Sequence, residues 1–335
     1  MTGRLGQASW TGTGTIGHDS HRAPSTFGGE TIIRNPIRFG IGLLLACIAG
    51  HAAAQEARLP PLPPVTTEAT GEYLPGKIIW ADLFSSDVDA ARDFYRRLFG
   101  WEWREIKPEP EGYGIFYLDD VPMAGLAYRA APEGHEQYGR WIHYLSVPDV
   151  AAAETFTTER GGRSLLSRIG QYPARGDFAI LAGPDKALFG VMRAAGGDPG
   201  DYAAWPNEWI WWQLYSENVD GSAEFYASLA GLETFENEMT ESKADIFLAS
   251  QGYLRGAVAP LSDEAKEKGT APTWLGFIRV EDPAAAAAKA RSLGGTVLYG
   301  PDPEMMDGNL AIISDPTGGT FAVMGWTYPE EEVQP

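Results

Sequence analysis

The chain has 335 residues, a length typical of two globular domains, and its 45 acidic residues against 26 basic ones give a formal net charge of −19. So acidic a surface repels phosphate, which disfavours nucleic-acid binding and docking on anionic lipid through a basic patch. The single cysteine excludes an internal disulfide and a thiolate zinc site, and five histidines leave few ligands for an imidazole metal centre.

Residues 1–54 have the composition of a leader. Residues 1–32 are rich in Gly, Ser and Thr without a helical or strand period, and we expect them to be disordered. Two arginines then flank an apolar run of roughly ten residues, too short to span a bilayer as a helix. The run ends in a lipobox-like LLAC with Cys47 as the lipidation site, and an AAA cleavage site follows at 52–54. We predict an exported bacterial protein, either periplasmic or a membrane-anchored lipoprotein; a buried core helix is the alternative.

Residues 55–75 form a Pro-rich linker. Four prolines between positions 60 and 64 predict a polyproline-type spacer, which would act as a stiff tether to the folded body. At the other end of the chain, residues 329–335 predict an acidic, solvated tail.

The body of the chain is an internal duplication. A strand pattern at 79–84, an N-cap at Asp87, a Phe-Tyr pair and a C-cap glycine recur at equal offsets in the block that starts at 210. A second pair of matching blocks starts at Val147 and Val280, each leading into an alanine-rich helix. We predict four βαβββ units in two domains, 76–196 and 205–328, separated by a cluster of glycine and proline.

The four units resemble the vicinal oxygen chelate (VOC) superfamily, which includes glyoxalase I, bleomycin-resistance proteins and extradiol dioxygenases. The motif D-V-D-x-A-x-x-F-Y-x-x-L-F-G-W at 87–101 carries the resemblance, which extends over about 76–326. It implies an α+β fold in which paired units form two glyoxalase/bleomycin-resistance-like domains, each an open mixed-sheet cup. Whether a cup forms within one half or between the halves stays open.

The resemblance also implies where a metal would bind, because metal-dependent members place His, Gln or Glu on the first strand of each unit and Glu on the last. These positions fall on Trp80, Ile142, Gly190, Trp211, Leu275 and Ala322. None of these side chains can ligate a divalent cation, so no cofactor is predicted. His143 is one residue from a ligand position, and strand alternation turns it toward the helices as a satisfied structural histidine, unless a bulge reverses it.

Aromatic side chains line the predicted cups, together with a few polar groups. Such walls suit a small planar or aromatic ligand, although the same side chains could simply fill the cups. The predicted ligand-binding residues are Trp80, Phe84, Tyr144, Trp211, Gln213, Tyr215, Phe277 and Arg279. Asp82 is the predicted catalytic residue, because desolvation beside Trp80 would raise its pKa and make it a general base. Arg279 could hold an anionic group or pair with Glu281 or Asp282 at the surface.

Three functions remain open. The first is a metal-independent VOC protein that binds a small, planar molecule in tryptophan-lined cups. The second is an enzyme related to lactoylglutathione lyase, or another VOC lyase, isomerase or oxygenase, with an atypical site at Asp82. The third is a non-catalytic interaction module with filled cups. The expected partner is a small molecule; nucleic acid is not expected, and membrane contact only through the lipid anchor.

Overall fold

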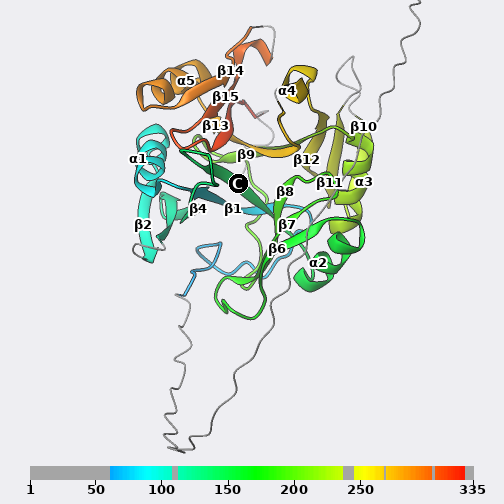
Figure 1. Ribbon diagram of the computed structural model, residues 1–335. Coiled ribbons are helices and arrows are strands. Elements are labelled where there is room, and N and C mark those ends of the chain that lie inside the picture. The colour runs from blue at the N-terminus through cyan, green and yellow to red at the C-terminus, as the bar shows by residue number, and fades with distance from the viewer. Residues whose placement is uncertain (1–60, 108–111, 237–244, 268, 304–305, 329–335) are drawn as a thin grey trace, which may run out of the picture. The chain divides into compact units, whose positions relative to one another are not determined.

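The computed structural model describes residues 61–107, 112–236, 245–267, 269–303 and 306–328, all within one compact unit, Glu56–Pro335 (Figure 1). The predicted leader with Cys47, the first part of the Pro-rich linker and the acidic tail lie outside these residues. In the part of the chain that is described, no helix combines the length and hydropathy needed to cross a membrane.

The first half forms an eight-stranded mixed sheet in the order β2-β3-β4-β1-β5-β8-β7-β6, with one helix in each unit. Its elements are β1 (Ile78–Ser85), α1 (Val88–Phe99), β2 (Glu102–Lys107), β3 (Tyr113–Leu118), β4 (Val121–Tyr128), β5 (Gly139–Ser146), α2 (Val150–Glu159), β6 (Arg163–Arg168), β7 (Gly176–Ala182) and β8 (Leu188–Ala194).

The second half repeats this sheet in the order β10-β11-β12-β9-β13-β16-β15-β14. Its elements are β9 (Trp209–Ser216), α3 (Val219–Ala230), β10 (Glu233–Glu236), β11 (Ile246–Ser250), β12 (Tyr253–Pro260), α4 (Asp263–Glu267), β13 (Thr273–Val280), α5 (Pro283–Ser292), β14 (Thr296–Tyr299), the 3-10 turn η1 (Met306–Gly308), β15 (Leu310–Ser314) and β16 (Thr320–Gly325). The predicted α+β fold of four repeated units is confirmed.

Strand pairing shows that each cup forms within one half. In the first half β1 pairs with β4 in parallel and with β5 in antiparallel orientation, so the two units of that half share one sheet. In the second half β9 makes the same two pairings with β12 and β13.

Local sequence determines the helix ends as predicted. The side chain of Asp87 accepts from the N–H of Ala90, and Asn218 does the same for Gly221 at the start of α3. Gly100 and Gly231 end these helices at φ 76° and 68°, a conformation that glycine adopts without the steric cost of a Cβ.

The faces that carry the helices pack together across the two halves. Helices α1 and α5 lie beside each other, as do α2 and α3 (Figure 1). One hydrophobic cluster joins Leu83 and Trp141 of the first half with Trp212, Ile278 and Phe321 of the second. Two smaller clusters lie on the opposite faces, one in each cup.

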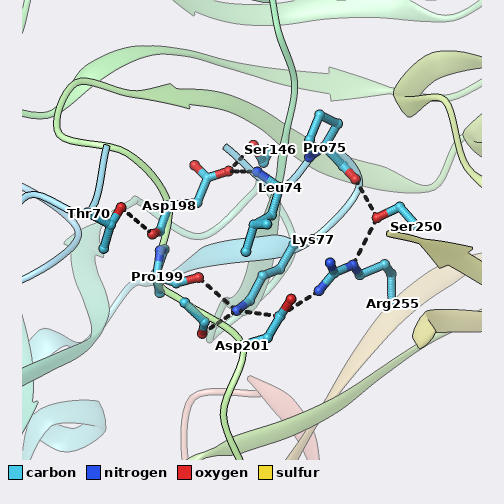
Figure 2. A network of polar contacts seen from close by, with 11 residues as sticks. Thr70, Leu74, Pro75, Lys77, Ser146, Asp198, Pro199, Asp201, Ser250 and Arg255 are labelled. Atoms are coloured by element: carbon cyan, nitrogen blue, oxygen red, sulfur yellow. Dashed lines mark hydrogen bonds and ion pairs between the residues drawn. The ribbon is translucent and has the colours of Figure 1, made fainter. Parts of the chain in front are cut away.

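Residues 61–76, which we name the N-terminal strap, pack onto the body. Val65 is 4% exposed and belongs to the cluster in the first cup. Asp198 of the inter-domain linker accepts from the Leu74 N–H at 2.7 Å, while Lys77 pairs with Asp201 at 2.9 Å (Figure 2). The expectation of a free stiff spacer therefore does not hold for these residues, because their apolar and backbone groups find partners in the body.

Candidate functional site

The first cup contains a buried polar group among aromatic and aliphatic side chains. Strand alternation places Trp80, Asp82 and Phe84 of β1 on the cup face, with Tyr144 of β5 opposite Trp80. Trp80 and Tyr144 are 4% and 1% exposed, and Asp82 is 8% exposed. The sequence therefore placed these side chains on the cup face correctly, and their roles in binding and catalysis stay predictions.

Asp82 is held by two aromatic donors and lies beside a third aromatic side chain. Its Oδ1 accepts from Trp80 Nε1 at 2.8 Å and from the Tyr113 hydroxyl at 3.1 Å, and Tyr144 is close enough to lower the pKa of the carboxyl. Gly125 makes room for this arrangement, because a Cβ there would lie 1.9 Å from Asp82 Oδ1 and 2.5 Å from the Tyr113 hydroxyl.

Burial raises the pKa of Asp82, whereas the positive charge of Arg175 and the polar groups of Trp80, Tyr144 and Tyr113 act in the opposite direction. Burial also raises the pKa of Tyr113 and Tyr144, and the nearby Asp82 charge adds to the effect. Both phenols therefore stay protonated, and Asp82, whose pKa is raised, is the group of this trio that can act as a base.

Arg175 completes the cluster, and the sequence did not point to it. The loop between β6 and β7 carries it into the cup, where its guanidinium carbon lies 4.2 Å from the centre of the Trp80 ring. It is 1% exposed. The internal duplication does not point to Arg175, because the equivalent residue of the second half is the exposed Asp307. Tyr113 was missed as well, and only its place on the cup face of β3 could have indicated it.

The second cup has the same walls and different polar chemistry. Trp211 Nε1 donates to Gln213 Oε1 at 3.3 Å, in the place of the Trp80–Asp82 bond. Phe277, Trp211 and Tyr215 belong to or pack on its hydrophobic cluster, as predicted. Burial, with a contribution from the charge of Asp245, raises the pKa of Tyr215 to about 12. Gln213 and the exposed Asp307 stand where the first cup has Asp82 and Arg175.

Arg279 lies at the end of β13, paired with Met324 of the second cup's cluster, and its donors are taken by backbone carbonyls, so its assignment to ligand binding stays a prediction. Its Nε donates to the Trp326 carbonyl at 3.0 Å, and its guanidinium lies over the Tyr328 ring and also donates to the Ala204 carbonyl. In the described residues it forms no ion pair with Glu281 or Asp282. The side chain instead joins the inter-domain linker to the end of the last strand.

His143 lies on the helix side of β5, as predicted, between Trp141, Trp209 and Trp212. It is 1% exposed, and neither ring nitrogen has a hydrogen-bond partner in the described chain. Its place among the core side chains was therefore predicted correctly, but the expectation that its hydrogen bonds are satisfied was wrong. Burial lowers its pKa to about 3.

The family's metal positions do not fit a divalent cation. Trp80 and Ile142 face the first cup, and a Cβ on Gly190 would meet the Tyr144 ring at 2.2 Å. Leu275 and Ala322 belong to the cluster of the second cup, with Trp211 packed on it. Divalent cations need several oxygen or imidazole donors that converge, and no group of three or more His, Cys, Asp or Glu residues in the described ranges offers them.

A pocket of about 320 Å³ lies beside the loop that carries Arg175. Tyr73 of the strap, Tyr172 and Arg193 form part of its lining. Its volume is at the lower end for small-molecule sites. The Arg193 guanidinium lies 3.4 Å from the centre of the Tyr73 ring, so the strap forms one wall of this pocket.

Family models match both halves of the chain. The model of the Glyoxalase/Bleomycin resistance protein/Dioxygenase superfamily matches residues 77–191, and that of the Glyoxalase-like domain matches residues 213–324. CFP32 of Mycobacterium tuberculosis, named as a glyoxylase, is 29% identical over 262 residues, which cover 76% of this chain and 96% of CFP32. The anthracycline biosynthesis protein DnrV of Streptomyces peucetius is 26% identical over 265 residues, or 75% of this chain and 94% of DnrV.

Solved structures share the fold at low identity. The Mn(II)-bound glyoxalase from Novosphingobium aromaticivorans has a TM-score of 0.51 at 18% identity, over 76% of this chain and 83% of that one. An extradiol ring-cleaving dioxygenase from B. fuscum has a TM-score of 0.52 at 14% identity, over 83% and 76%. The chain thus carries two glyoxalase-type domains in tandem and belongs to the Glyoxalase/Bleomycin resistance protein/Dioxygenase superfamily.

Proposed function

We propose that the first cup binds a small planar molecule and that its chemistry is carried by side chains instead of a divalent metal on the family's ligand positions. The observation that carries this proposal is the buried cluster of Trp80, Asp82, Tyr113 and Tyr144. A buried carboxylate is a poor core filler, and a wall of indole and phenol groups offers faces on which a flat molecule can stack.

The difference between the cups supports the first one as the functional site. Replacing a carboxylate by an amide, as from Asp82 to Gln213, removes a charge and a proton-exchanging group while the tryptophan beside it is kept. The name of the relative DnrV, an anthracycline biosynthesis protein, agrees with a planar ligand, since anthracyclines contain fused aromatic rings.

An enzymatic role of Asp82 is the second candidate, and its raised pKa favours it. A carboxyl whose pKa is raised toward neutrality can take a proton from a bound molecule and return it, which is the step that lyases and isomerases need. The hydroxyls of Tyr113 and Tyr144 would remain donors to an oxygen that gains charge during that step.

The test is a tryptophan fluorescence titration with a panel of flat molecules that differ in size and charge. We expect at least one member to bind, and Trp80→Phe to weaken that binding by about tenfold, as the loss of a stacking face would. Trp211→Phe, the matched change in the second cup, should leave that affinity within about twofold.

Two results would contradict the proposal. A panel in which no member changes the fluorescence of the wild-type protein would favour filled cups and an interaction module. Stoichiometric Mn, Fe, Ni or Zn in the purified protein would contradict a site without a divalent metal. An Asp82→Asn variant that converts a bound molecule as fast as the wild type does would contradict only the enzymatic role.

A further inference from the structure

Arg175 is a buried cation whose donors are unused. None of its guanidinium nitrogens Nε, Nη1 and Nη2 has a hydrogen-bond partner in the described part of the chain, although the side chain is only 1% exposed. An arginine cannot escape this situation by losing its proton, because its pKa is too high. Most buried polar groups in folded proteins are hydrogen-bonded, so an orphaned guanidinium calls for a reason other than stability.

A second buried arginine shows how this fold pairs a guanidinium when the role is structural, although its Nη2 also lacks a partner in the described chain. Arg255 is 7% exposed, and its Nε donates to Ser250 Oγ at 2.9 Å while its Nη1 pairs with Asp201 at 2.6 Å (Figure 2). Arg175 has no such partners. It differs from Arg255 in lying inside a cup, beside the residues that the proposed function already uses.

The surroundings of Arg175 balance its charge without using its N–H groups. The face of Trp80 at 4.2 Å provides a cation–π contact, and Asp82 is close enough for the charge of Arg175 to lower the pKa of that carboxyl. Asp82 Oδ1, however, already accepts from Trp80 and Tyr113, and it does not reach Arg175 as a hydrogen-bond or ion-pair partner. The N–H groups of Arg175 are therefore left without an acceptor in the described part of the chain.

We propose that Arg175 is the residue of the first cup that recognises an anion, and that the molecule bound there is a planar organic carboxylate. This inference rests on the proposed function of that cup. A carboxylate matches the guanidinium fork with two parallel hydrogen bonds, and the plane attached to it can stack on the aromatic wall. A phosphate dianion fits less well, since a single guanidinium faces it and the carboxylate of Asp82 lies close by.

The experiment compares matched pairs of an acid and its neutral amide, benzoate with benzamide and 2-naphthoate with 2-naphthamide, by calorimetric titration. Wild-type protein should bind the acid at least tenfold more tightly than the amide. Arg175→Met should abolish this preference and leave the affinity for the amide within about twofold of the wild-type value. Arg175→Lys keeps the charge but not the planar guanidinium, so its preference for the acid should lie between those of the wild type and Arg175→Met.

Two control variants separate recognition from structure. Arg193→Met removes the same charge from the neighbouring strand β8 outside the cup cluster, and it should keep the preference for the acid. Arg255→Met should lower the melting temperature, because it leaves Asp201 and Ser250 without their partner. Arg175→Met should lower it by less, because it removes only the contact with Trp80 and the charge beside Asp82, and no hydrogen bond.

The outcomes distinguish this inference from the proposed function. If wild-type protein binds acid and amide equally, or if Arg175→Met keeps the preference, the role of Arg175 is overturned and the cup remains a binding site. If neither member of either pair binds, the proposed function fails together with the inference. Inorganic phosphate that raises the melting temperature as much as the acids do would overturn the choice of an organic carboxylate.

Discussion

At the scale of single residues, His143 shows how an unpaired polar group makes stability depend on pH. Its imidazole lies among Trp141, Trp209 and Trp212, with ring centres 6.4, 6.0 and 4.5 Å away, and Gly276 leaves space for it. Burial lowers its pKa to about 3 in the folded protein, against about 6.5 in an unfolded chain. The unfolded chain therefore binds a proton that the folded protein refuses.

It follows that the protein loses stability through His143 as the pH falls from about 6.5 toward 3. Between pH 7 and pH 5 this loss should amount to about 2 kcal/mol of the free energy of unfolding. His143→Phe should remove it, and any packing cost of the larger ring would be the same at both pH values. Urea unfolding at pH 7 and pH 5 measures the difference.

His135→Phe is the control, because His135 is exposed in the loop before β5. This variant should keep the wild-type pH dependence. If His143→Phe loses as much stability as the wild type on acidification, then His143 is not buried as a neutral imidazole.

At the scale of elements, the N-terminal strap is a part of the fold that can be released separately. Asp198 is fully buried and accepts from the Leu74 N–H and the Ser146 hydroxyl through Oδ2. The backbone adds bonds between Asp198 and Glu72 and between Gly71 and Gly196 (Figure 2 shows the side-chain part of this network). One carboxylate thus connects the strap, β5 and the inter-domain linker.

Asp198→Ala should therefore detach the strap before the rest of the domain unfolds. The Leu74 amide and the Ser146 hydroxyl lose a charged acceptor, a loss of about 2–3 kcal/mol, so hydrogen exchange at Gly71 and Leu74 should become faster by at least tenfold. Glu72→Ala is the matched control, because its side chain makes none of these bonds. Exchange that accelerates equally across β5 would show that the strap does not open by itself.

The strap also shows what could be predicted from the sequence and what could not. Cap residues such as Asp87 and Gly100 act within a few residues of themselves, so the duplicated helices and strands were predicted correctly. The burial of Val65 depends on a surface formed by strands far away in the chain, about which its proline-rich surroundings contain no information.

The same reason divides the candidate site. Strand alternation placed Trp80 and Asp82 correctly, because both lie on one regular strand. It also placed Arg279 on the cup face of β13, but it could not show that backbone carbonyls of Ala204 and Trp326 take the donors of that side chain. It gave no information about Arg175, which a loop brings into the cup. Residues on loops are positioned by tertiary structure, and a single sequence has no local pattern that predicts where their side chains lie.

At the scale of the whole described body, the two halves share one core and exchange polar contacts. Trp101 Nε1 donates to the Asn207 carbonyl at 2.9 Å, and Trp209 Nε1 donates back to the Met123 carbonyl at 3.0 Å. Lys289 of α5 caps the end of α1 through the Leu98 carbonyl. The apolar, helix-bearing face of each half is buried against the other half, so we expect the two halves to unfold together.

The duplication is nevertheless asymmetric at the centre of this interface. Tyr95 of α1 donates to Asp315 of the second half at 2.9 Å and accepts from the Trp141 indole at 3.0 Å. The equivalent Tyr226 and Trp274 pack edge to face in the same way, with ring centres 5.0 Å apart. Gly183 stands where Asp315 does, however, and in the described chain both polar groups lack a hydrogen-bond partner.

This asymmetry predicts unequal effects of one substitution made in both halves. Tyr95→Phe removes a hydroxyl bonded to a buried carboxylate and should lower the free energy of unfolding by about 2–3 kcal/mol. Tyr226→Phe removes an unpaired hydroxyl and should change it by less than about 0.5 kcal/mol, or raise it. Thermal unfolding followed by both far-UV circular dichroism and tryptophan fluorescence should show a single transition for each variant. Equal losses would contradict the asymmetry, whereas two transitions that separate in Tyr95→Phe would show that the halves are independent folding units joined by a weak interface.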